Sequence, residues 1–265
     1  MTTLSAPAKL TTKLEVRGVR NDGFHLLSAE MVSLDLSDSL EIEPAPAVSL
    51  EVVEAVDWVG VAPSEPAAET ARPNLVEEAL RHCGQVARCR LTKRIPAGAG
   101  LGGGSSDAAA ILRWSGVADP KEAAALGADV PFCLRGGRAH VTGIGEEIEQ
   151  LEPLERSFVL LTPRLHVSTP VVYRAWDALG GPAGEHGNDL EPAALVAYPA
   201  LRWWRDLMAA ASAERPRLAG SGGTWFIECN VEKGRDLADD LRAEVVAGRE
   251  GAFVKVARTR ELPLA

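Results

Sequence analysis

Apolar and polar residues alternate along much of the first part of the chain, and this period of two predicts β-strands. Residues 13–19 and 26–36 show the alternation, and the turn between them, Arg20-Asn21-Asp22-Gly23, has hairpin character. The pattern continues at residues 40–43, 48–53 and 88–95. Residues 55–73 are rich in Ala, Pro and Glu and show no period, so a surface excursion is expected there.

Helical and strand patterns are mixed over the rest of the chain. Asn74 is placed to cap a helix that runs through residue 82. Further helices are expected at residues 108–112, 120–126, 171–179, 193–208 and 233–246, and further strands at residues 158–162, 225–229 and 252–257. The acidic, proline-containing residues 151–156 mark a boundary. We therefore expect an α+β chain with two domains, residues 1–153 and 154–265.

Composition and charge exclude several classes of protein. The 265 residues are 46% apolar and 25% charged, enough to bury a sizeable core. A net charge of −9 argues against a general nucleic-acid binder, whose affinity rests on basic surface. We expect neither a secretory signal, because residues 1–8 show no basic region leading into an apolar one, nor a membrane-spanning segment, because no apolar run is long enough. The scattered Cys83, Cys89, Cys133 and Cys229 indicate reduced thiols. We expect a cytoplasmic protein with neither nucleic-acid nor membrane partners, as a monomer or homodimer.

The segment from Lys93 to Asp107 carries the clearest chemical signal. Five glycines lie between Gly98 and Gly104, and the helix-forming run 108–112 follows. Ser105 or Ser106 is expected to cap that helix, with Asp107 in its first turn. Such a loop directs several backbone N–H groups at one point, which predicts phosphate binding.

Three phosphate-loop interpretations compete with a flexible linker. The ATPase P-loop fails, because Gly103 is followed by Gly104 rather than by Lys and Ser or Thr. The dinucleotide fingerprint is matched formally by Gly98, Gly100 and Gly103, but no strand ending in an acid follows about twenty residues later. A linker is rarely followed at once by a capped helix. The segment from Pro96 resembles the third pattern, the Pro-x-x-x-Gly-Leu-Gly-x-x-Ser-Ser loop of the GHMP small-molecule kinases.

Other motifs point to one branch of that superfamily, and they cover nearly the whole chain. In family order they are Pro7-Ala8-Lys9-Leu10, Arg20-Asn21-Asp22-Gly23-Phe24-His25, residues 93–110, residues 126–132, residues 167–173, Asn188-Asp189-Leu190-Glu191 and residues 220–226. Together they resemble the 4-diphosphocytidyl-2-C-methyl-D-erythritol kinases of the non-mevalonate isoprenoid pathway. The resemblance implies a GHMP kinase fold, with an N-terminal α/β domain like domain 2 of a ribosomal protein and a ferredoxin-like C-terminal domain. It also implies a small-molecule substrate, ATP and Mg²⁺.

The resemblance also implies roles for individual residues. Asp129 matches the carboxylate that takes the proton from the attacking 2-hydroxyl, and Lys9 matches the lysine beside it. The nucleotide side comprises Asn74, Lys93, Pro96, Gly98, Gly100, Leu101, Gly102, Gly103, Gly104, Ser105 and Ser106. The substrate side comprises Phe24, His25, Thr169, Tyr173 and Asp189, with Phe24 and Tyr173 stacking on cytosine and His25 at its edge. The two serine hydroxyls are candidate Mg²⁺ contacts, and the metal ligands stay unassigned.

Plainer interpretations stay open beside these. Asp129 could cap a helix, Lys9 could be a solvated lysine, and Phe24 and Tyr173 could be core residues. The chain also departs from the family at Thr11, where an Asn is usual, and at Gly223, where Ser or Ala is usual. The competing functions are another GHMP kinase acting on a different alcohol, and a lapsed kinase retained as a binding protein.

Overall fold

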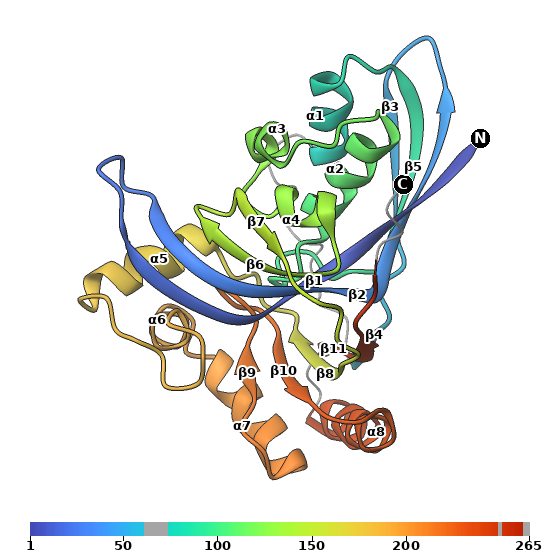
Figure 1. Cartoon of the computed structure of the whole chain (residues 1–265). Helices are drawn as coiled ribbons and strands as arrows, with labels where there is room; N and C mark the ends of the chain where they lie inside the picture. The colour runs from blue at the N-terminus through green and yellow to red at the C-terminus, as the bar shows by residue number, and fades with distance from the viewer. Residues whose placement is uncertain (61–73, 249–250, 262–265) are drawn as a thin grey trace.

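A long, bent hairpin is the spine of the molecule. In the computed structural model, which describes residues 1–60, 74–248 and 251–261, β1 (Thr2–Val19) pairs antiparallel with β2 (His25–Pro44). The hairpin spans the molecule from end to end; it forms part of the first sheet, and the second sheet lies against it (Figure 1). Its register sets Lys9 opposite Ser33, and a shift between Pro7 and Lys9 interrupts the ladder at that point.

The first sheet holds six strands in the order β3-β5-β2-β6-β7, with β1 paired to β2. The other strands are β3 (Ser49–Glu54), β5 (Ala87–Lys93), β6 (Arg138–Gly143) and β7 (Glu147–Gln150). Helices α1 (Leu75–His82), α2 (Gly103–Trp114), α3 (Pro120–Ala123) and α4 (Val130–Arg135) lie on one side of it, with the 3₁₀ turn η1 (Ala124–Leu126) (Figure 1). Their apolar faces and the sheet form one buried core.

The second sheet holds five antiparallel strands in the order β4-β11-β8-β10-β9. They are β4 (Trp58–Gly60), β8 (Ser157–Pro163), β9 (Arg217–Leu218), β10 (Trp225–Glu228) and β11 (Gly251–Arg258). Helices α5 (Thr169–Ala178), α6 (Glu191–Ala197), α7 (Leu201–Ser212) and α8 (Val231–Gly248) pack with it around a second core. The edge strand β4 comes from the first half of the chain.

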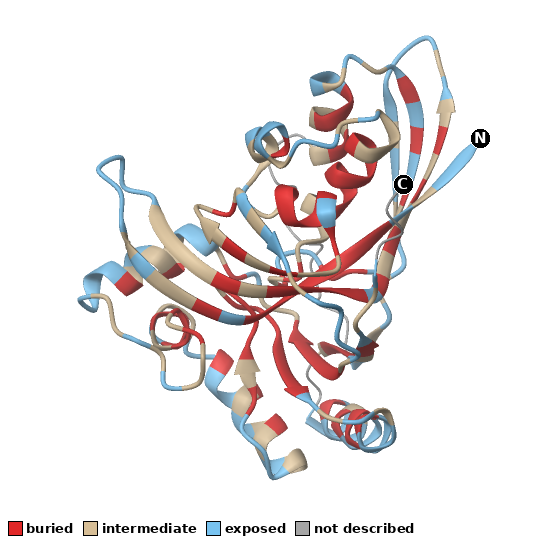
Figure 2. Ribbon diagram, in the orientation of Figure 1, coloured by how far each residue is buried: buried red, intermediate tan, exposed pale blue. Residues whose placement is uncertain are grey.

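A third buried cluster joins the two sheets beneath the glycine-rich segment. It combines Ala8 and Leu10 of β1 with Phe158, Leu160 and Phe226 of the second sheet. Ala99 and Leu101 of the glycine-rich segment belong to the same cluster. Buried residues are continuous where the hairpin crosses the second sheet (Figure 2). The glycine-rich segment is therefore anchored from below by apolar side chains of both sheets.

Most of the predicted elements are confirmed. The segments at residues 26–36 and 40–43 are parts of one strand, β2. Asn74 caps α1 as predicted, and its Oδ1 accepts from Val76 N at 3.0 Å. The excursion at 55–73 contains the short strand β4, and residues 61–73 lie outside the described part of the chain. Within the described ranges no helix has both the length and the apolar character needed to cross a membrane.

Three local predictions are wrong. Asp107, expected in the first turn of the helix that follows the glycine-rich segment, lies beyond that turn, because α2 begins at Gly103 and its first turn holds no acid. The single helix expected at residues 193–208 is two helices, because Pro199 lies in the break between α6 and α7 and cannot donate a helical hydrogen bond. The cap expected at Ser105 or Ser106 is instead Gly102, in the left-handed conformation with φ of 67°. The Ser106 hydroxyl is buried and donates to the Pro7 carbonyl at 2.6 Å, so it takes no part in capping.

Candidate active site

Lys9 and Asp129 form an ion pair at the meeting of β1 and α4. Lys9 Nζ lies 3.2 Å from Asp129 Oδ2, and the lysine side chain is almost fully buried. The Asp129 side chain is one third exposed, and it precedes α4 without capping it through its side chain. The buried ammonium thus contacts one oxygen of the carboxylate, and part of the carboxylate stays accessible.

Lys9 is held in place by the glycine loop, which we define as residues 96–104. Its backbone N–H donates to the Leu101 carbonyl at 2.9 Å. Its aliphatic stem lies on Gly102, where a Cβ atom would fall 2.7 Å from Lys9 Cγ. The lysine therefore passes beneath the loop, and only a glycine leaves room for it at position 102.

The start of α2 presents backbone N–H groups that are free to bind an anion. The backbone N–H of Ser106 already bonds to the Gly102 carbonyl at 2.8 Å. The N–H groups of Gly103, Gly104 and Ser105 precede it in the first turn and have no acceptor within the helix. Unpaired N–H groups together with the positive end of the helix dipole favour a phosphate at this position.

A second lysine flanks the loop on its other side. Lys93 Nζ pairs with Asp38 and lies 2.7 Å from Asp107 Oδ2. A Cβ atom at Gly103 would lie 3.1 Å from this ammonium, so Lys93 is next to the start of α2. Burial lowers the pKa of Lys93, but the two carboxylates outweigh it and raise that pKa overall. The lysine is therefore a fixed cation beside the loop.

Two carboxylates share that one ammonium, and they are not equivalent. Asp38 also accepts hydrogen bonds from the backbone N–H groups of Arg94 and Ile95. Asp107 Oδ1 has no hydrogen-bond partner among the described residues. Burial, with the second carboxylate nearby, raises the pKa of Asp107 to about 7. Asp38 was not predicted from the sequence, although an acid in phase with Leu34, Leu36 and Leu40 was a signal for it.

A second glycine turn, residues 220–223, lies close to Lys9. A Cβ atom at Gly220 would lie 3.6 Å from Thr11 Oγ1 and 3.8 Å from Lys9 Nζ. A Cβ atom at Gly223 would come within 2.9 Å of Ala99 in the glycine loop. The absence of a side chain at Gly223 therefore lets the two glycine segments touch.

Thr11 contacts Lys9 directly. Its Oγ1 accepts a hydrogen bond from Lys9 Nζ at 3.2 Å, and the residue is buried. The ammonium of Lys9 thus has two acceptors, this hydroxyl and the Asp129 carboxylate. The departure from the family pattern at position 11 retains an acceptor for the lysine.

The motif at residues 188–191 supports the second glycine turn. Asn188 Nδ2 donates to the carbonyls of Leu218 and Gly220, at 2.8 and 2.7 Å. Both oxygens of Asp189 accept from backbone, from Val16 N and Gly184 N, each at 2.8 Å. Thr169, at the start of α5, shares a hydrogen bond of 2.7 Å with Ser221 of the turn. Thr169 thus contacts the second glycine turn, whereas both carboxylate oxygens of Asp189 are occupied by backbone N–H groups outside that turn.

His25 and Tyr173 meet at the other end of the site. Their ring centroids are 4.6 Å apart, with planes inclined by 34°. Burial, together with the nearby charge of Asp129, raises the pKa of the Tyr173 phenol to about 12. Tyr173 is therefore near both the His25 imidazole and the carboxylate of Asp129. Phe24 is separate from these two rings, with a side chain more than half exposed.

The remaining predicted nucleotide residues lie around the loop. Asn74 uses its side-chain oxygen to cap α1. Pro96 and Leu101 are buried, and Leu101 contributes its backbone carbonyl to Lys9. Gly98 is exposed and lies against His166, whose Nδ1 would be 2.6 Å from a Cβ atom at that position. His166 was not predicted from the sequence, and nothing in its own segment indicated a phosphate site.

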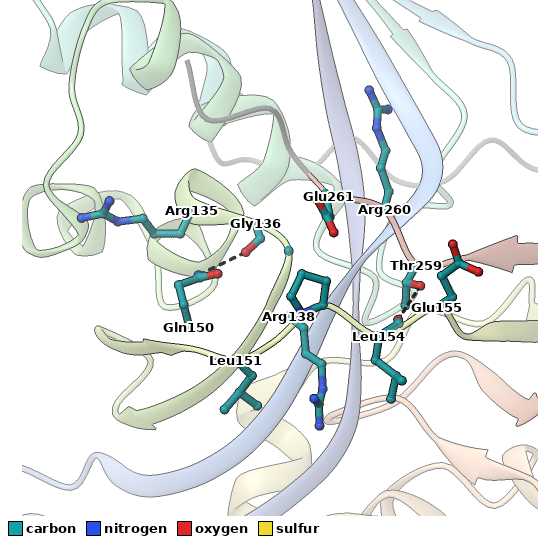
Figure 3. A pocket seen from close by; sticks show the side chains of 12 residues that line it. Arg135, Gly136, Arg138, Gln150, Leu151, Leu154, Glu155, Thr259, Arg260 and Glu261 are labelled. Atoms are coloured by element: carbon teal, nitrogen blue, oxygen red, sulfur yellow. Dashed lines mark hydrogen bonds between the residues drawn. The ribbon is translucent and has the colours of Figure 1, made fainter.

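Two hollows lie apart from these residues. One, of about 810 Å³, is bounded by the end of α4, residues 150–155 and the end of β11. The side chains of Arg135, Arg138 and Arg260 at its rim point in different directions (Figure 3). The other, of about 450 Å³, lies against α6 beside the Glu191–Arg215 ion pair. None of the described residues that line either hollow belongs to the predicted site.

Comparisons with known proteins find relatives over most of the chain. The model of the GHMP kinases N terminal domain matches residues 71–137. A 4-diphosphocytidyl-2-C-methyl-D-erythritol kinase of Paracoccus denitrificans is 37% identical over 241 residues, 84% of this chain and 85% of that protein. One from Cereibacter sphaeroides is 36% identical over 273 residues, 92% of this chain and 95% of that protein.

Solved structures give the same result. A crystal structure of 4-(cytidine 5'-diphospho)-2C-methyl-D-erythritol kinase superimposes with a TM-score of 0.72 and 31% identity, covering 98% of this chain and 100% of that one. Homoserine kinase from Cytophaga hutchinsonii shares the fold, with a TM-score of 0.61 at 19% identity over 98% and 96% of the two chains. The α+β fold predicted from the sequence is confirmed.

Proposed function

This chain belongs to the 4-diphosphocytidyl-2-C-methyl-D-erythritol kinase family of the GHMP kinases, and we propose from that membership a role for each residue of its site. The reaction is the ATP-dependent phosphorylation of the 2-hydroxyl of 4-diphosphocytidyl-2-C-methyl-D-erythritol, in isoprenoid biosynthesis. The observation that supports the assignment of roles best is the Lys9–Asp129 ion pair, 3.2 Å apart and covered by the glycine loop.

Asp129 acts as the general base. A tertiary alcohol is a poor nucleophile, so removal of its proton as the bond to phosphorus forms lowers the barrier. The carboxylate is partly exposed, which lets a hydroxyl approach one oxygen while Lys9 holds the other. The proton passes from the 2-hydroxyl to Asp129, the oxygen bonds to the γ-phosphorus of ATP, and ADP leaves.

Lys9 stabilises charge during that transfer. Its ammonium offsets the negative charge that develops on the attacking oxygen. Thr11 and the Leu101 carbonyl fix the lysine, through its ammonium and its backbone N–H respectively. Little reorganisation is then needed at the moment of transfer.

The glycine loop and the first turn of α2 hold the triphosphate. The unpaired N–H groups of Gly103, Gly104 and Ser105 donate to its oxygens. Lys93, fixed by Asp38 and Asp107, adds a positive charge beside Gly103. Phosphoryl transfer depends mainly on such positioning and charge stabilisation.

The side-chain oxygens near the loop fit Mg²⁺ bound chiefly through the triphosphate, with few protein ligands. The Ser106 hydroxyl is already committed to the Pro7 carbonyl, so the hydroxyl of Ser105 is the one that would hold the ion. When bound, the ion would neutralise part of the negative charge on the phosphates.

The pyrimidine end of the substrate lies at His25 and Tyr173. An imidazole and a phenol ring from distant parts of the chain form an aromatic surface suited to a flat base. Phe24, exposed at the tip of the β1–β2 hairpin, is free to cover the other side of the base.

The test is turnover with purified protein and Mg·ATP. We expect phosphorylation of 4-diphosphocytidyl-2-C-methyl-D-erythritol at the 2-hydroxyl, located by phosphorus and carbon NMR of the product. Mevalonate, homoserine and galactose serve as competing acceptors and should react far more slowly. Preference for one of these would assign the chain to another GHMP activity, and binding without turnover would show a lapsed kinase.

A further inference from the structure

Three side chains of α5 enclose the imidazole of His25. Tyr173 stacks on it at 4.6 Å, and Trp176 meets it edge-on with ring centroids 5.5 Å apart. His25 Nε2 lies 2.8 Å from Asp177 Oδ1. The three residues are spaced i, i+3 and i+4, which places them on one face of the helix. The imidazole side chain is about one tenth exposed, so its orientation is fixed by these neighbours.

Asp177 lies at a position in α5 where a negative charge destabilises the helix. It lies in the last turn of α5, where the negative end of the helix dipole disfavours an acid. Its side chain is half exposed, and its one side-chain hydrogen bond within the described ranges is to His25. The group on which this carboxylate acts is therefore the imidazole of His25. His25 belongs to the β1–β2 hairpin, in the other half of the chain.

The contact determines where the imidazole carries its hydrogen. An ionised carboxylate only accepts hydrogen bonds, so Nε2 must be the nitrogen that carries the hydrogen. In a neutral ring the other nitrogen, Nδ1, then presents a lone pair and can only accept. In the part of the chain that the structure describes, Nδ1 has no hydrogen-bond partner. Nδ1 is also not fully buried.

We propose that Asp177 is a positioning residue that makes this site selective for cytosine over uracil. By holding the hydrogen of His25 on Nε2, it leaves Nδ1 as an acceptor for the 4-amino group of cytosine. Uracil carries a carbonyl oxygen at that position, so two acceptors would face each other. The inference rests on the proposed function, which puts the base at His25.

Replacing the carboxylate by an amide removes the constraint. The side-chain amide in Asp177→Asn can accept from Nε2–H or donate to Nε2, so both ring tautomers become available. The ring with its hydrogen on Nδ1 can donate to the uracil oxygen. We therefore expect Asp177→Asn to lower the ratio of kcat/KM for the cytidine substrate to that for its uridine analogue by about tenfold.

The kinetic experiment compares 4-diphosphocytidyl- and 4-diphosphouridyl-2-C-methyl-D-erythritol in wild type, Asp177→Asn and Asp177→Ala. The change should fall on KM for the pyrimidine substrates, and KM for ATP should stay as in wild type. Asp240→Asn, the same substitution on the exposed side of α8, is the matched control and should change neither. An unchanged ratio in folded Asp177→Asn would overturn the inference.

A second measurement reports the tautomer directly. Nitrogen-15 chemical shifts of the His25 ring, recorded at pH 8.5, above the ordinary imidazole pKa of about 6.5, distinguish a protonated Nε2 from a protonated Nδ1. Wild type should show the hydrogen on Nε2, and Asp177→Asn should show a mixture. A hydrogen on Nδ1 in wild type would contradict the proposal.

Failure of the proposed function would be separable from failure of this inference. If wild type turns over neither substrate, the kinase assignment is wrong. Calorimetric binding of cytidine 5'-diphosphate and uridine 5'-diphosphate to wild type and Asp177→Asn then decides the inference. A wild-type preference for cytidine that is lost in the variant supports it, and equal binding by both proteins overturns it.

Discussion

The backbone of Gly102 lies against the side chain of Lys9, so closely that a Cβ atom at position 102 would fall 2.7 Å from Lys9 Cγ. Gly102 also has a φ of 67°, which other residues adopt only at a cost. The same glycine therefore begins α2 and seats the lysine. The start of α2, where we propose that phosphate binds, and the orientation of Lys9 therefore both depend on the absence of a side chain at position 102.

Gly102→Ala should damage catalysis beyond its cost in stability. The added methyl must displace Lys9 from Asp129, and a misplacement of about 1 Å can cost about 100-fold in rate. We expect kcat/KM to fall at least about 100-fold and the free energy of unfolding to fall by about 1–3 kcal/mol. Gly116→Ala is the control, because its φ is 82° and no atom lies within 4 Å of its added Cβ. That variant should lose stability only; equal kinetic loss in both would show that the Lys9 contact is unimportant.

Asp129→Asn tests the general base. An amide cannot take the proton from the 2-hydroxyl, so kcat should fall by on the order of 10²–10⁴. ATP binding, measured by calorimetry, should be nearly unchanged because we propose that the triphosphate is held by α2 and not by Asp129. Asp119→Asn serves as the control, since Asp119 caps α3 through Lys121 N and Asn caps equally well. Near-normal turnover in Asp129→Asn would remove this residue from the mechanism.

His25→Ala tests the pyrimidine end. Loss of a hydrogen-bond partner at a largely buried polar edge costs about 1–3 kcal/mol, which corresponds to a rise in KM for the cytidine substrate of about 5- to 150-fold. ATP binding, measured separately, should be unaffected. A fall in ATP affinity instead would place His25 on the nucleotide side of the site.

Thr11 should tolerate Asn but not Val. Both Thr and Asn offer an oxygen acceptor to Lys9, so Thr11→Asn should change kcat/KM by no more than about tenfold. Thr11→Val has nearly the shape of Thr and lacks the acceptor that Lys9 uses at 3.2 Å. We expect the larger loss in Thr11→Val, on the order of tenfold in kcat. Equal rates in Thr11→Val and wild type would show that the hydroxyl does not orient the lysine.

An ionic network between the two sheets predicts acid sensitivity. Arg156 donates to Glu228 through both Nε and Nη2, at 2.7 and 2.6 Å, and to Glu30 of β2 at 2.9 Å. The hydrogen bond from Arg156 lowers the pKa of Glu228 below its ordinary value of 4.5. The stabilisation of the folded state by the Glu228–Arg156 pair is therefore fully present above about pH 4.5. It is lost as the pH falls through the lowered folded-state pKa of Glu228.

The variant Glu228→Gln should flatten this dependence. Because the glutamate side chain is more than one third exposed, we expect it to contribute no more than about 1 kcal/mol at pH 7. Urea unfolding at pH 7 and at pH 3.5 measures both quantities. Glu43→Gln, at an exposed pair with Arg88 within the first sheet, is the matched control. A steeper loss of stability on acidification in Glu228→Gln than in wild type would contradict the sign.

Local sequence was sufficient for those features that depend on neighbours along the chain. The glycine loop, the Asn74 cap and the hairpin turn at residues 20–23 were predicted correctly, because backbone conformation there follows from residues a few positions apart. The predicted cap at Ser105 or Ser106 failed for a reason outside the segment. A long-range hydrogen bond from Ser106 to Pro7 competes with capping, and sequence spacing carries no signal for it.

Tertiary structure decided which distant residues meet. Lys9 was matched to Asp129 by resemblance, but its contact with Gly102 follows from the packing of β1 beneath the loop. The pairing of Lys93 with Asp38 depends on the antiparallel register of β2 and β5, which a strand pattern leaves undetermined. The contact of His25 with Asp177 joins the hairpin of one half to a helix of the other. The sequence thus determined which charged and polar side chains are present. The long-range packing of the two sheets determined which partner each charged group has.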